Sequence, residues 1–369
     1  MHKTIPAALI SLILCLGGCE VTESGSSKTD SPGTLTIATW NVQTLFDGAE
    51  AGTEYDDYRG SAGWTGEKYT ARLNSFAQAI SRMIETAPDI LGLIEIENSP
   101  VLTDLVTGFL SKYGYHWTFF ASNPNAALGI GMISRFPFTE TKVHSITAQG
   151  ETIPRPVLEV RLQPQDTPVV LFVCHWKSKV GGDTLTESSR RASARVIQRR
   201  LWEIRQENPV IPVVIMGDLN ENHDEFYRND GSVISALLPD DQKAAELTGF
   251  IQAKQQDFLI LSRNKPPTPE YFASDATVLY SPWGNELQDG SYHYKGAWET
   301  IDHFLLTDAL FDQTGWDFDS CRVINQEPFV DAHGNPAAYN PRTGNGLSDH
   351  LPLVLVLKHT PGAAFTMPE

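Results

Sequence analysis

The chain has 369 residues, of which 41% are hydrophobic and 20% charged, and its 45 acidic and 28 basic residues give a formal net charge of −17. The apolar content is too high for a disordered chain, and the negative charge excludes a protein that binds nucleic acid through overall basicity. A nuclease is not excluded, because a local electropositive site or bound cations can serve that chemistry. Beyond the N-terminus, no stretch approaches the roughly 20 apolar residues of a membrane-spanning helix.

The first residues have the pattern of a targeting segment. A positively charged start precedes a short apolar run at residues 5–16, and the sequence Leu-Gly-Gly-Cys that ends at Cys19 resembles the lipobox of bacterial lipoproteins. We therefore expect residues 1–18 to be a lipoprotein signal peptide, Cys19 to carry the lipid, and the polar segment 19–33 to be a flexible tether. The protein would then be extracytoplasmic and lipid-anchored to a bacterial membrane. An ordinary secretory signal with an incidental Cys is the alternative interpretation.

Apolar periodicity predicts many strands with a few helices between them in the rest of the chain. Because strands and helices do not alternate strictly, the pattern favours an α+β fold in which mixed sheets pack face to face with helices outside. The predicted strands cover residues 34–41, 89–96, 115–121, 128–134, 155–162, 168–175, 210–216, 276–280, 301–306 and 351–357, and the predicted helices cover residues 71–84, about 99–113 and about 186–208.

Acidic and amide side chains occur where these strands begin or end. Polar groups at several strand ends, far apart in the sequence, are how a sheet assembles one site from many elements. Any one of them could be a solvated strand end, but the whole set beside long apolar runs is unexpected by chance. Oxygen ligands without Cys–His clusters favour Mg²⁺, Mn²⁺ or Ca²⁺ over structural zinc. The residues are Asn41, Glu95, Asp218, Asn220, Asp302, Asp349 and His350.

The motifs around these residues resemble those of the endonuclease/exonuclease/phosphatase superfamily, which includes deoxyribonucleases, apurinic endonucleases, sphingomyelinases and inositol-polyphosphate phosphatases. They follow one another in the family's order over residues 34–357. The resemblance implies a four-layer α/β/β/α sandwich of two packed mixed β-sheets with outer helices, in a single domain over residues 34–359 with a tail at 360–369. The motifs are TWN at 39–41, IE at 94–95, MGDLN at 216–220, TIDH at 300–303 and LSDHLP at 347–352.

The resemblance also implies a metal site. Glu95 would be the main ligand of the divalent cation, with Asp349 and Asn41 close to it. The cation would neutralise a phosphate oxygen and the charge that develops during in-line displacement. Gln43 departs from the family pattern, because many relatives have an acidic residue two positions after the Asn of the first strand. The neutral amide weakens the case for a second, permanently occupied metal site.

The catalytic roles follow from the same resemblance. Asp218 and Asn220 would hold the attacking water or the scissile phosphate. His350 would act as base or proton shuttle and would be oriented by Asp302, since a buried carboxylate beside an imidazole fixes its tautomer and raises its basicity. His175 matches the family position that donates a hydrogen bond to phosphate and protonates the leaving oxygen. A polar His at the rim of the sheet is the alternative interpretation of His175.

Basic residues concentrate after His175. Residues 177–205 contain eight basic and three acidic residues in a chain that is strongly acidic overall. Lys177, Lys179 and Arg190 lie beside the proposed site, where phosphate contacts would suit them, although a solvated helix face is the simpler account of the other arginines. Arg155 is expected in the phosphate-side loop. The aromatic residues Tyr292, Tyr294 and Trp298 could stack on bases or pack in the core.

We therefore expect a divalent-metal-dependent phosphodiesterase that uses Mg²⁺, or Mn²⁺ or Ca²⁺, and that acts as an extracytoplasmic nuclease on DNA or RNA. Its partners would be the nucleic acid substrate and the membrane reached through the lipid anchor; no protein partner is inferred, and a monomer is expected. A phospholipid or sphingomyelin phosphodiesterase, or a phosphatase, of the same fold is the first alternative, and the loop around Trp283 is its candidate membrane hairpin. A non-catalytic surface adhesin is the second, which the presence of the main acids and both His disfavours.

Overall fold

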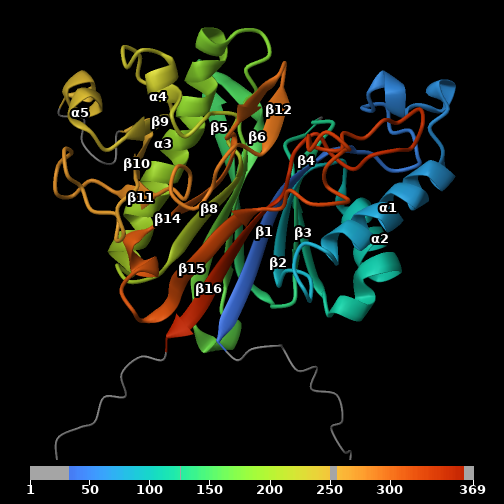
Figure 1. Ribbon diagram of the computed structural model, residues 1–369, viewed down its shortest axis with the longest axis horizontal. Helices are drawn as coiled ribbons and strands as arrows, with labels where there is room; N and C mark the ends of the chain where they lie inside the picture. Colours follow the sequence, from blue (N-terminus) through green and yellow to red (C-terminus); the bar gives the residue numbers. More distant parts are fainter. Residues whose placement is uncertain (1–32, 125, 250–255, 361–369) are drawn as a thin grey trace, which may run out of the picture. The chain divides into compact units, whose positions relative to one another are not determined.

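Two mixed β-sheets form the centre of the fold (Figure 1). The computed structural model describes residues 33–124, 126–249 and 256–360. The expected signal peptide, the lipidation site Cys19, most of the tether and most of the C-terminal tail lie outside the described residues. Among the described residues, no helix is long and apolar enough to cross a membrane.

The first sheet has six strands, which are mostly antiparallel, with one parallel pair at its centre. The second has eight strands and contains both parallel and antiparallel pairs. In spatial order the first sheet consists of β15 (Gly315–Val323), β16 (Leu353–Thr360), β1 (Thr34–Leu45), β2 (Ile90–Ile96), β4 (Gly129–Ser134) and β3 (Trp117–Ala121). The second consists of β5 (Phe138–Ala148), β6 (Glu151–Leu162), β7 (Val169–His175), β8 (Val213–Asp218), β14 (Asp302–Leu306), β11 (Val278–Tyr280), β10 (Leu259–Ser262) and β9 (Leu237–Pro239).

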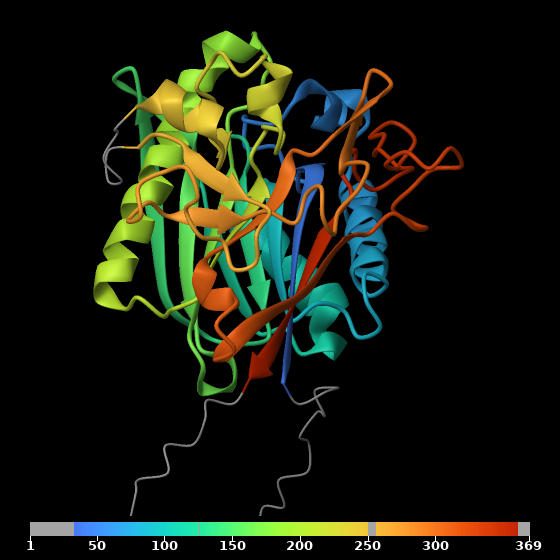
Figure 2. The same cartoon turned by 60° about the vertical axis from the view of Figure 1, so that its left-hand side comes forward.

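Helices cover the outer faces of both sheets, as Figure 2 shows for the largest of them. Two helices lie on the first sheet, α1 (Gly66–Ile80) and α2 (Ser99–Leu105), and the long helix α3 (Asp183–Glu207) lies on the second. The remaining elements are α4 (Glu225–Arg228), α5 (Gln242–Thr248), the hairpin strands β12 (Tyr292–Tyr294) and β13 (Ala297–Glu299), the π-type segment η3 (Val106–Leu110), and the 3₁₀ segments η1 (Asp56–Tyr58), η2 (Gly60–Ala62), η4 (Ser111–Tyr113), η5 (Pro164–Asp166) and η7 (Asp308–Leu310).

Three of the four apolar clusters formed by the described residues hold these layers together. Residues from the inner faces of both sheets, such as Ile37 and Met216, form the central core. The sheets approach closely at Gly92, where a Cβ atom would lie 2.7 Å from the Cε atom of Met216. Phe76 of α1 belongs to the core on the outside of the first sheet, and Leu201 of α3 belongs to the core on the outside of the second. The expected four-layer α/β/β/α sandwich is therefore confirmed.

Candidate active site

Strand pairing brings the predicted polar residues to one edge of the sandwich. Strands β7 and β8 are parallel, so that His175 and Asp218 lie opposite each other at their carboxyl ends. Strand β14 is antiparallel to β8 and begins with Asp302 opposite Asp218. In the other sheet, β1 and β2 are parallel and pair Asn41 with Ile94, the neighbour of Glu95. Parallel strands place their carboxyl ends at the same edge, where ligands commonly bind.

The backbone is irregular where these strands reach the edge. The pairing of β1 with β2 shifts register between Asn41 and Leu45, and Gln43, Thr44 and Glu95 all have positive φ angles, of 52°, 54° and 71°. The Thr44 N–H donates a hydrogen bond of 2.8 Å to Glu95 Oε2. Such bulges re-aim side chains at the edge of a sheet, and strained non-Gly residues concentrate at functional sites. The strained backbone coincides with the polar strand ends, and this edge is the candidate active site.

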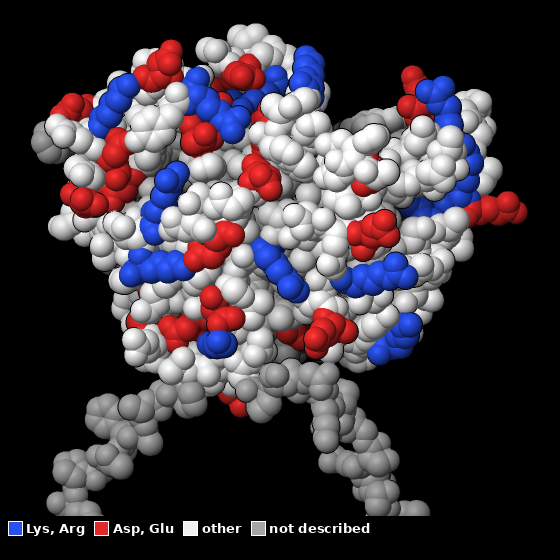
Figure 3. Space-filling model, viewed as in Figure 1, with Lys and Arg blue, Asp and Glu red and all other residues white. Residues whose placement is uncertain are grey.

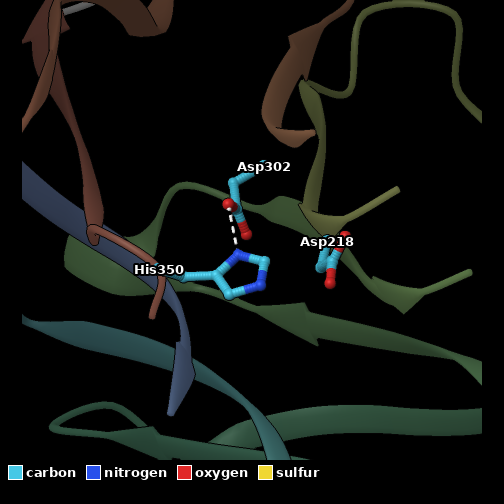
Figure 4. A group of neighbouring side chains, drawn as sticks. All are labelled: Asp218, Asp302 and His350. Atoms are coloured by element: carbon cyan, nitrogen blue, oxygen red, sulfur yellow. Dashed lines mark hydrogen bonds and ion pairs between the residues drawn. The ribbon is translucent and has the colours of Figure 1, made fainter. Parts of the chain in front are cut away.

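His350 lies between two buried carboxylates, as Figure 4 shows. Its Nδ1–H donates a 2.8 Å hydrogen bond to Asp302 Oδ2, which also accepts a 2.7 Å hydrogen bond from Ser291 Oγ. Asp302 Oδ1 is buried and has no hydrogen-bond partner among the described residues. Asp218 is buried on the other side of the imidazole. The arrangement holds one tautomer of His350 and leaves its Nε2 available for chemistry.

The surroundings of the two site histidines shift their pKa values in opposite directions. Burial opposes the charged form of His350, but the negative charge of Asp302 and its hydrogen bond outweigh burial and raise the pKa of His350 to about 10. Burial lowers the pKa of His175 well below its ordinary value, and the positive charges of Arg155, His350 and Lys177 lower it further. The site therefore combines a strongly basic imidazole with one that stays neutral.

A second group of polar side chains lies next to this pair. Asn41 Nδ2 is 3.1 Å from Asp218 Oδ2 and 3.4 Å from Glu95 Oε1. His175 Nε2 lies 3.7 Å from Glu95 Oε1 and 3.8 Å from Asp218 Oδ2. The backbone N–H of Asn220 donates to Asp218 Oδ1 at 2.9 Å. The residues that the sequence singled out as catalytic are thus gathered in one place with Asn41 and Glu95.

Three buried side chains of the site are close enough together to hold a divalent cation. The ligand atoms of Asp218, Asp302 and His350 all lie within 4.8 Å of one another. Burial and the nearby charge of Asp302 raise the pKa of Asp218 to about 7, although His350 opposes the shift. The free oxygen of Asp302 and the crowding of carboxylates fit a bound cation. Glu95 and Asp349, which the sequence predicted as ligands, are both partly exposed.

Gln43 has a role that sequence reasoning missed. Its Oε1 accepts hydrogen bonds from the backbone N–H groups of Tyr339 and Asp349 at 2.7 and 3.0 Å, and its Nε2 donates to the Tyr339 carbonyl at 3.2 Å. The amide therefore joins the end of β1 to the segment that carries Asp349. Only the loss of an acidic residue was visible in the sequence, because the partners of Gln43 lie about 300 residues away.

The four cations predicted to bind substrate have different surroundings. Arg190 is buried, and its Nε is 3.1 Å from Glu221 Oε2 while its Nη2 is 2.5 Å from Glu187 Oε2. The expectation that Arg190 contacts phosphate is therefore corrected, since its charge is already compensated inside the protein. Lys179 Nζ lies 2.6 Å from Glu225 Oε2.

Lys177 and Arg155 remain beside His175 and are partly exposed. Arg155 donates to the carbonyl of Trp176, and burial together with the charges of Arg155 and Arg190 lowers the pKa of Lys177. The other five arginines of the basic segment all form ion pairs, with Glu159, Glu203, Asp257 or Asp308. Four of them are partly or fully exposed, as expected of a solvated helix face, but Arg200 is buried against Glu159, which corrects that expectation for Arg200.

The comparisons agree with this architecture. The family model described as the Endonuclease/Exonuclease/phosphatase family matches residues 36–256. No curated protein is a significant match. Truncated TDP2 from Caenorhabditis elegans is 14% identical with a TM-score of 0.51, covering 88% of this chain and 97% of that chain. A family protein from Bacteroides thetaiotaomicron is 13% identical with a TM-score of 0.51, covering 92% and 99%.

A third solved structure has the same fold. The endonuclease/exonuclease/phosphatase from Bacteroides vulgatus is 15% identical with a TM-score of 0.50, covering 89% of this chain and 100% of that chain. At these identities the structural similarity shows the fold alone, and the family model, which covers more than half of the chain, shows the family. With its paired strand ends, its buried Asp302–His350 pair and its matching motifs, the chain belongs to the endonuclease/exonuclease/phosphatase family.

Proposed function

We propose that the protein is a divalent-metal-dependent phosphodiesterase that acts as an extracytoplasmic nuclease. The observation that carries this proposal is the buried Asp302–His350 pair beside Asp218, at the edge where Glu95, Asn41 and His175 also meet. An imidazole that can take a proton from water, next to a second, neutral imidazole that can donate an N–H hydrogen bond to the phosphate, suits hydrolysis.

The proposed reaction is attack of water on the phosphorus of a phosphodiester. His350, held by Asp302, takes a proton from the water as its oxygen bonds to phosphorus, and Asp218 with the backbone of Asn220 orients that water. His175 donates a hydrogen bond to the phosphate. The ester P–O bond breaks opposite the attacking oxygen, the leaving oxygen takes a proton from solvent water, and His350 afterwards releases its proton to solvent. Before the reaction His350 must be neutral, and positive charge near its carboxylate neighbours favours that form.

Glu95 and Asp349 would hold the divalent cation. We assign the cation to them because Asp302 and His350 are already hydrogen-bonded to each other, whereas the Glu95 carboxylate is partly exposed at the edge. When bound, the cation would neutralise a phosphate oxygen in the transition state. The Asp218, Asp302 and His350 group could hold a second cation only in competition with that hydrogen bond.

A nucleic acid is the proposed substrate class. Lys177 and Arg155 lie beside His175, where they can contact the phosphates that flank the scissile bond. In Figure 3, Lys and Arg are interspersed with Asp and Glu over the face shown, so that any attraction to nucleic acid is local. The lipid-phosphodiesterase alternative was based on an exposed apolar loop at Trp283, but Trp283 is 1% exposed and belongs to the central core. A lipid anchor at Cys19 and a monomeric state remain part of the proposal.

The test compares the full-length protein on plasmid DNA, RNA, sphingomyelin and inositol phosphates in parallel, with Mg²⁺ and with EDTA. We expect hydrolysis of a nucleic acid that EDTA abolishes and that Mg²⁺ or Mn²⁺ restores. His350→Ala should abolish it, and Lys142→Ala, on an exposed strand edge, should not. Hydrolysis of a lipid or inositol phosphate with no action on nucleic acid would reject the nuclease, and full activity in EDTA would reject the metal.

A further inference from the structure

A short hairpin next to His350 belongs to neither large sheet. Strands β12 and β13 form a sheet of their own and are joined by Lys295 and Gly296, which have positive φ angles of 50° and 85°. Two consecutive positive φ angles are the pattern of a type I′ turn, which suits a tight two-residue hairpin. The label β12 in Figure 1 marks the hairpin beside the ends of the central strands. The hairpin is therefore a compact element at the active-site edge.

The base of the hairpin is fixed to the catalytic pair through Ser291. Its side chain donates to Asp302 Oδ2 at 2.7 Å, and its carbonyl accepts a 2.7 Å hydrogen bond from the backbone of Leu351, next to His350. Its N–H donates to the Glu299 carbonyl at 3.0 Å. Gly290 leaves no room for a side chain, because a Cβ atom there would lie 2.6 Å from the Glu299 oxygen. The hairpin is thus held in a set position relative to Asp302 and His350.

Aromatic rings lead outward from His350 along this hairpin. The ring of Tyr292 stacks on His350 with centroids 4.5 Å apart and planes at 29°. Tyr294 lies 6.1 Å further along with its plane at 14° to that of Tyr292, and 48% of Tyr294 is exposed. Lys295 Nζ is 5.0 Å from the centre of the Tyr294 ring. We call Tyr292, Tyr294 and Lys295 the aromatic row.

An exposed ring and a cation at a fixed position beside a phosphodiesterase centre suit one kind of ligand. A nucleobase can stack on an aromatic side chain whatever its sequence, and a lysine can contact the phosphate next to it. A base inside a duplex already stacks on its neighbours and is paired, so it must leave the helix before it can lie on Tyr294. The aromatic row therefore fits unpaired bases.

We propose that the aromatic row is a base-stacking platform and that the preferred substrate is single-stranded nucleic acid. The inference rests on the proposed nuclease function and adds its substrate class. The base beside the scissile phosphate stacks on the outer face of Tyr294, while Lys295 contacts a flanking phosphate and Tyr292 links the row to His350. A membrane contact suits the hairpin less well, because Gly296 and Ala297 beside Tyr294 add little apolar surface.

The test uses the full-length protein and the variants Tyr294→Ala and Tyr294→Phe. Tyr271→Ala is the matched control, because Tyr271 is 47% exposed and lies on a different loop. Each protein is assayed on a single-stranded oligonucleotide, on the same oligonucleotide in a duplex, and on a small chromogenic phosphodiester. Binding of the fluorescent single strand is measured separately in EDTA, so that a readout without turnover is included.

Tyr294→Ala should raise the KM for the single strand by roughly 5- to 150-fold, the range expected for the loss of one stacked base. The dissociation constant of the single strand, measured in the presence of EDTA, should rise by a similar factor. Hydrolysis of the small ester should change little, while Tyr294→Phe and Tyr271→Ala should behave like the parent. Equal losses on all three substrates, or no loss on the single strand, would overturn the platform. Binding to anionic phospholipid vesicles is measured in parallel, and a loss confined to that binding would also overturn the platform, in favour of a membrane contact.

Failure of the nuclease proposal would give a different experimental result from failure of the base-stacking platform. If the parent protein hydrolyses the small ester but no nucleic acid, the proposed function fails on its own. In that case, binding of the single strand in the presence of EDTA still tests the platform. Affinity for the single strand that depends on Tyr294 supports the platform. Affinity that does not depend on Tyr294, or no affinity, overturns it.

Discussion

Gln43 Oε1 accepts a hydrogen bond of 3.0 Å from the backbone N–H of Asp349, a residue 306 positions away in the chain. With its two hydrogen bonds to the backbone of Tyr339, the Gln43 amide holds the segment before the last strand against the end of β1. Many relatives are expected to have an acidic residue at the position of Gln43. In this chain the amide at that position instead holds the backbone that carries the Asp349 carboxylate. Gln43 is therefore a positioning residue in this chain.

The first prediction concerns this amide. Gln43→Ala removes three hydrogen bonds, so we expect the segment around Tyr339 to exchange its amide hydrogens faster and kcat/KM to fall by roughly tenfold or more, because misplaced groups are costly in catalysis. Gln43→Glu keeps the acceptor but puts a carboxylate against the Tyr339 carbonyl, and it should also lower activity. Hydrogen exchange and kinetics check both. If Gln43→Glu instead has higher activity and binds Mg²⁺ more tightly, position 43 is part of a metal site and not a positioning residue.

The second prediction concerns the Asp302–His350 pair. Asp302→Asn removes the charge that raises the pKa of His350, so the pKa should fall from about 10 toward its ordinary value of 6.5. Activity should fall by roughly 10²–10⁴-fold, the usual contribution of a positioned acid or base. NMR titration of the imidazole in EDTA, beside steady-state kinetics, measures both effects. An unchanged His350 pKa in the variant would contradict this account of its basicity.

The third prediction is a pH dependence of stability away from the site. Burial disfavours the Glu159 carboxylate, but hydrogen bonds from His144 and Arg200 outweigh burial and lower its pKa to about 2. Its ordinary pKa is 4.5. A lowered pKa adds stability above the ordinary value, and that stability is lost as pH falls toward 2.

The shift of Glu159 corresponds to about 3 kcal/mol at pH 7. Unfolding free energies of the parent protein should therefore drop steeply between about pH 4.5 and pH 2. Glu159→Gln should lack that part of the slope and be less stable at pH 7, because Arg200 is left buried without its partner. Glu140→Gln, at a carboxylate that is 44% exposed, is the control and should keep the slope. Identical slopes in all three proteins would reject the assignment.

The fourth prediction contrasts the buried Arg190 with the partly exposed Lys177. Arg190→Ala leaves Glu221 and Glu187 unpaired inside the protein, so the free energy of unfolding should fall by about 3–5 kcal/mol. Lys177→Ala should leave that stability nearly unchanged but raise KM for nucleic acid and lower the log–log salt slope by roughly 0.9 on duplex DNA. Denaturant titrations and salt-dependent kinetics measure the two effects. If Lys177→Ala leaves the salt slope unchanged, Lys177 does not contact a phosphate of the substrate.

The fifth prediction tests the membrane anchor. Cys19→Ala should release the protein from the membrane fraction without changing kcat/KM, since the candidate site is formed entirely by residues after position 40. Fractionation and mass spectrometry of the N-terminal peptide provide the measurement. Unmodified Cys19 in a protein that partitions in the same way as its variant would reject the lipoprotein proposal.

The central strands and the site motifs could be predicted from the sequence for a simple physical reason. Strands β2 and β8 are buried on both faces, so they appear as continuous apolar runs that stop at Glu95 and Asp218. Strand β5 was missed because it lies at the edge of its sheet, where side chains such as Glu140 face solvent and the apolar pattern is broken. The short strands β9 and β12 offer too few residues for any periodicity.

The sequence by itself determined the family, the four-layer fold and the residues at the strand ends, because these depend on local runs and short motifs. Only the tertiary structure decided which partners face those residues. It buried Arg190 between two carboxylates, joined Gln43 to Asp349, and placed Tyr292 on His350. Hydrogen bonds and ring stacking act over a few ångströms in space, and the residues that they join lie from a few to some 300 positions apart, so no local pattern could have revealed them.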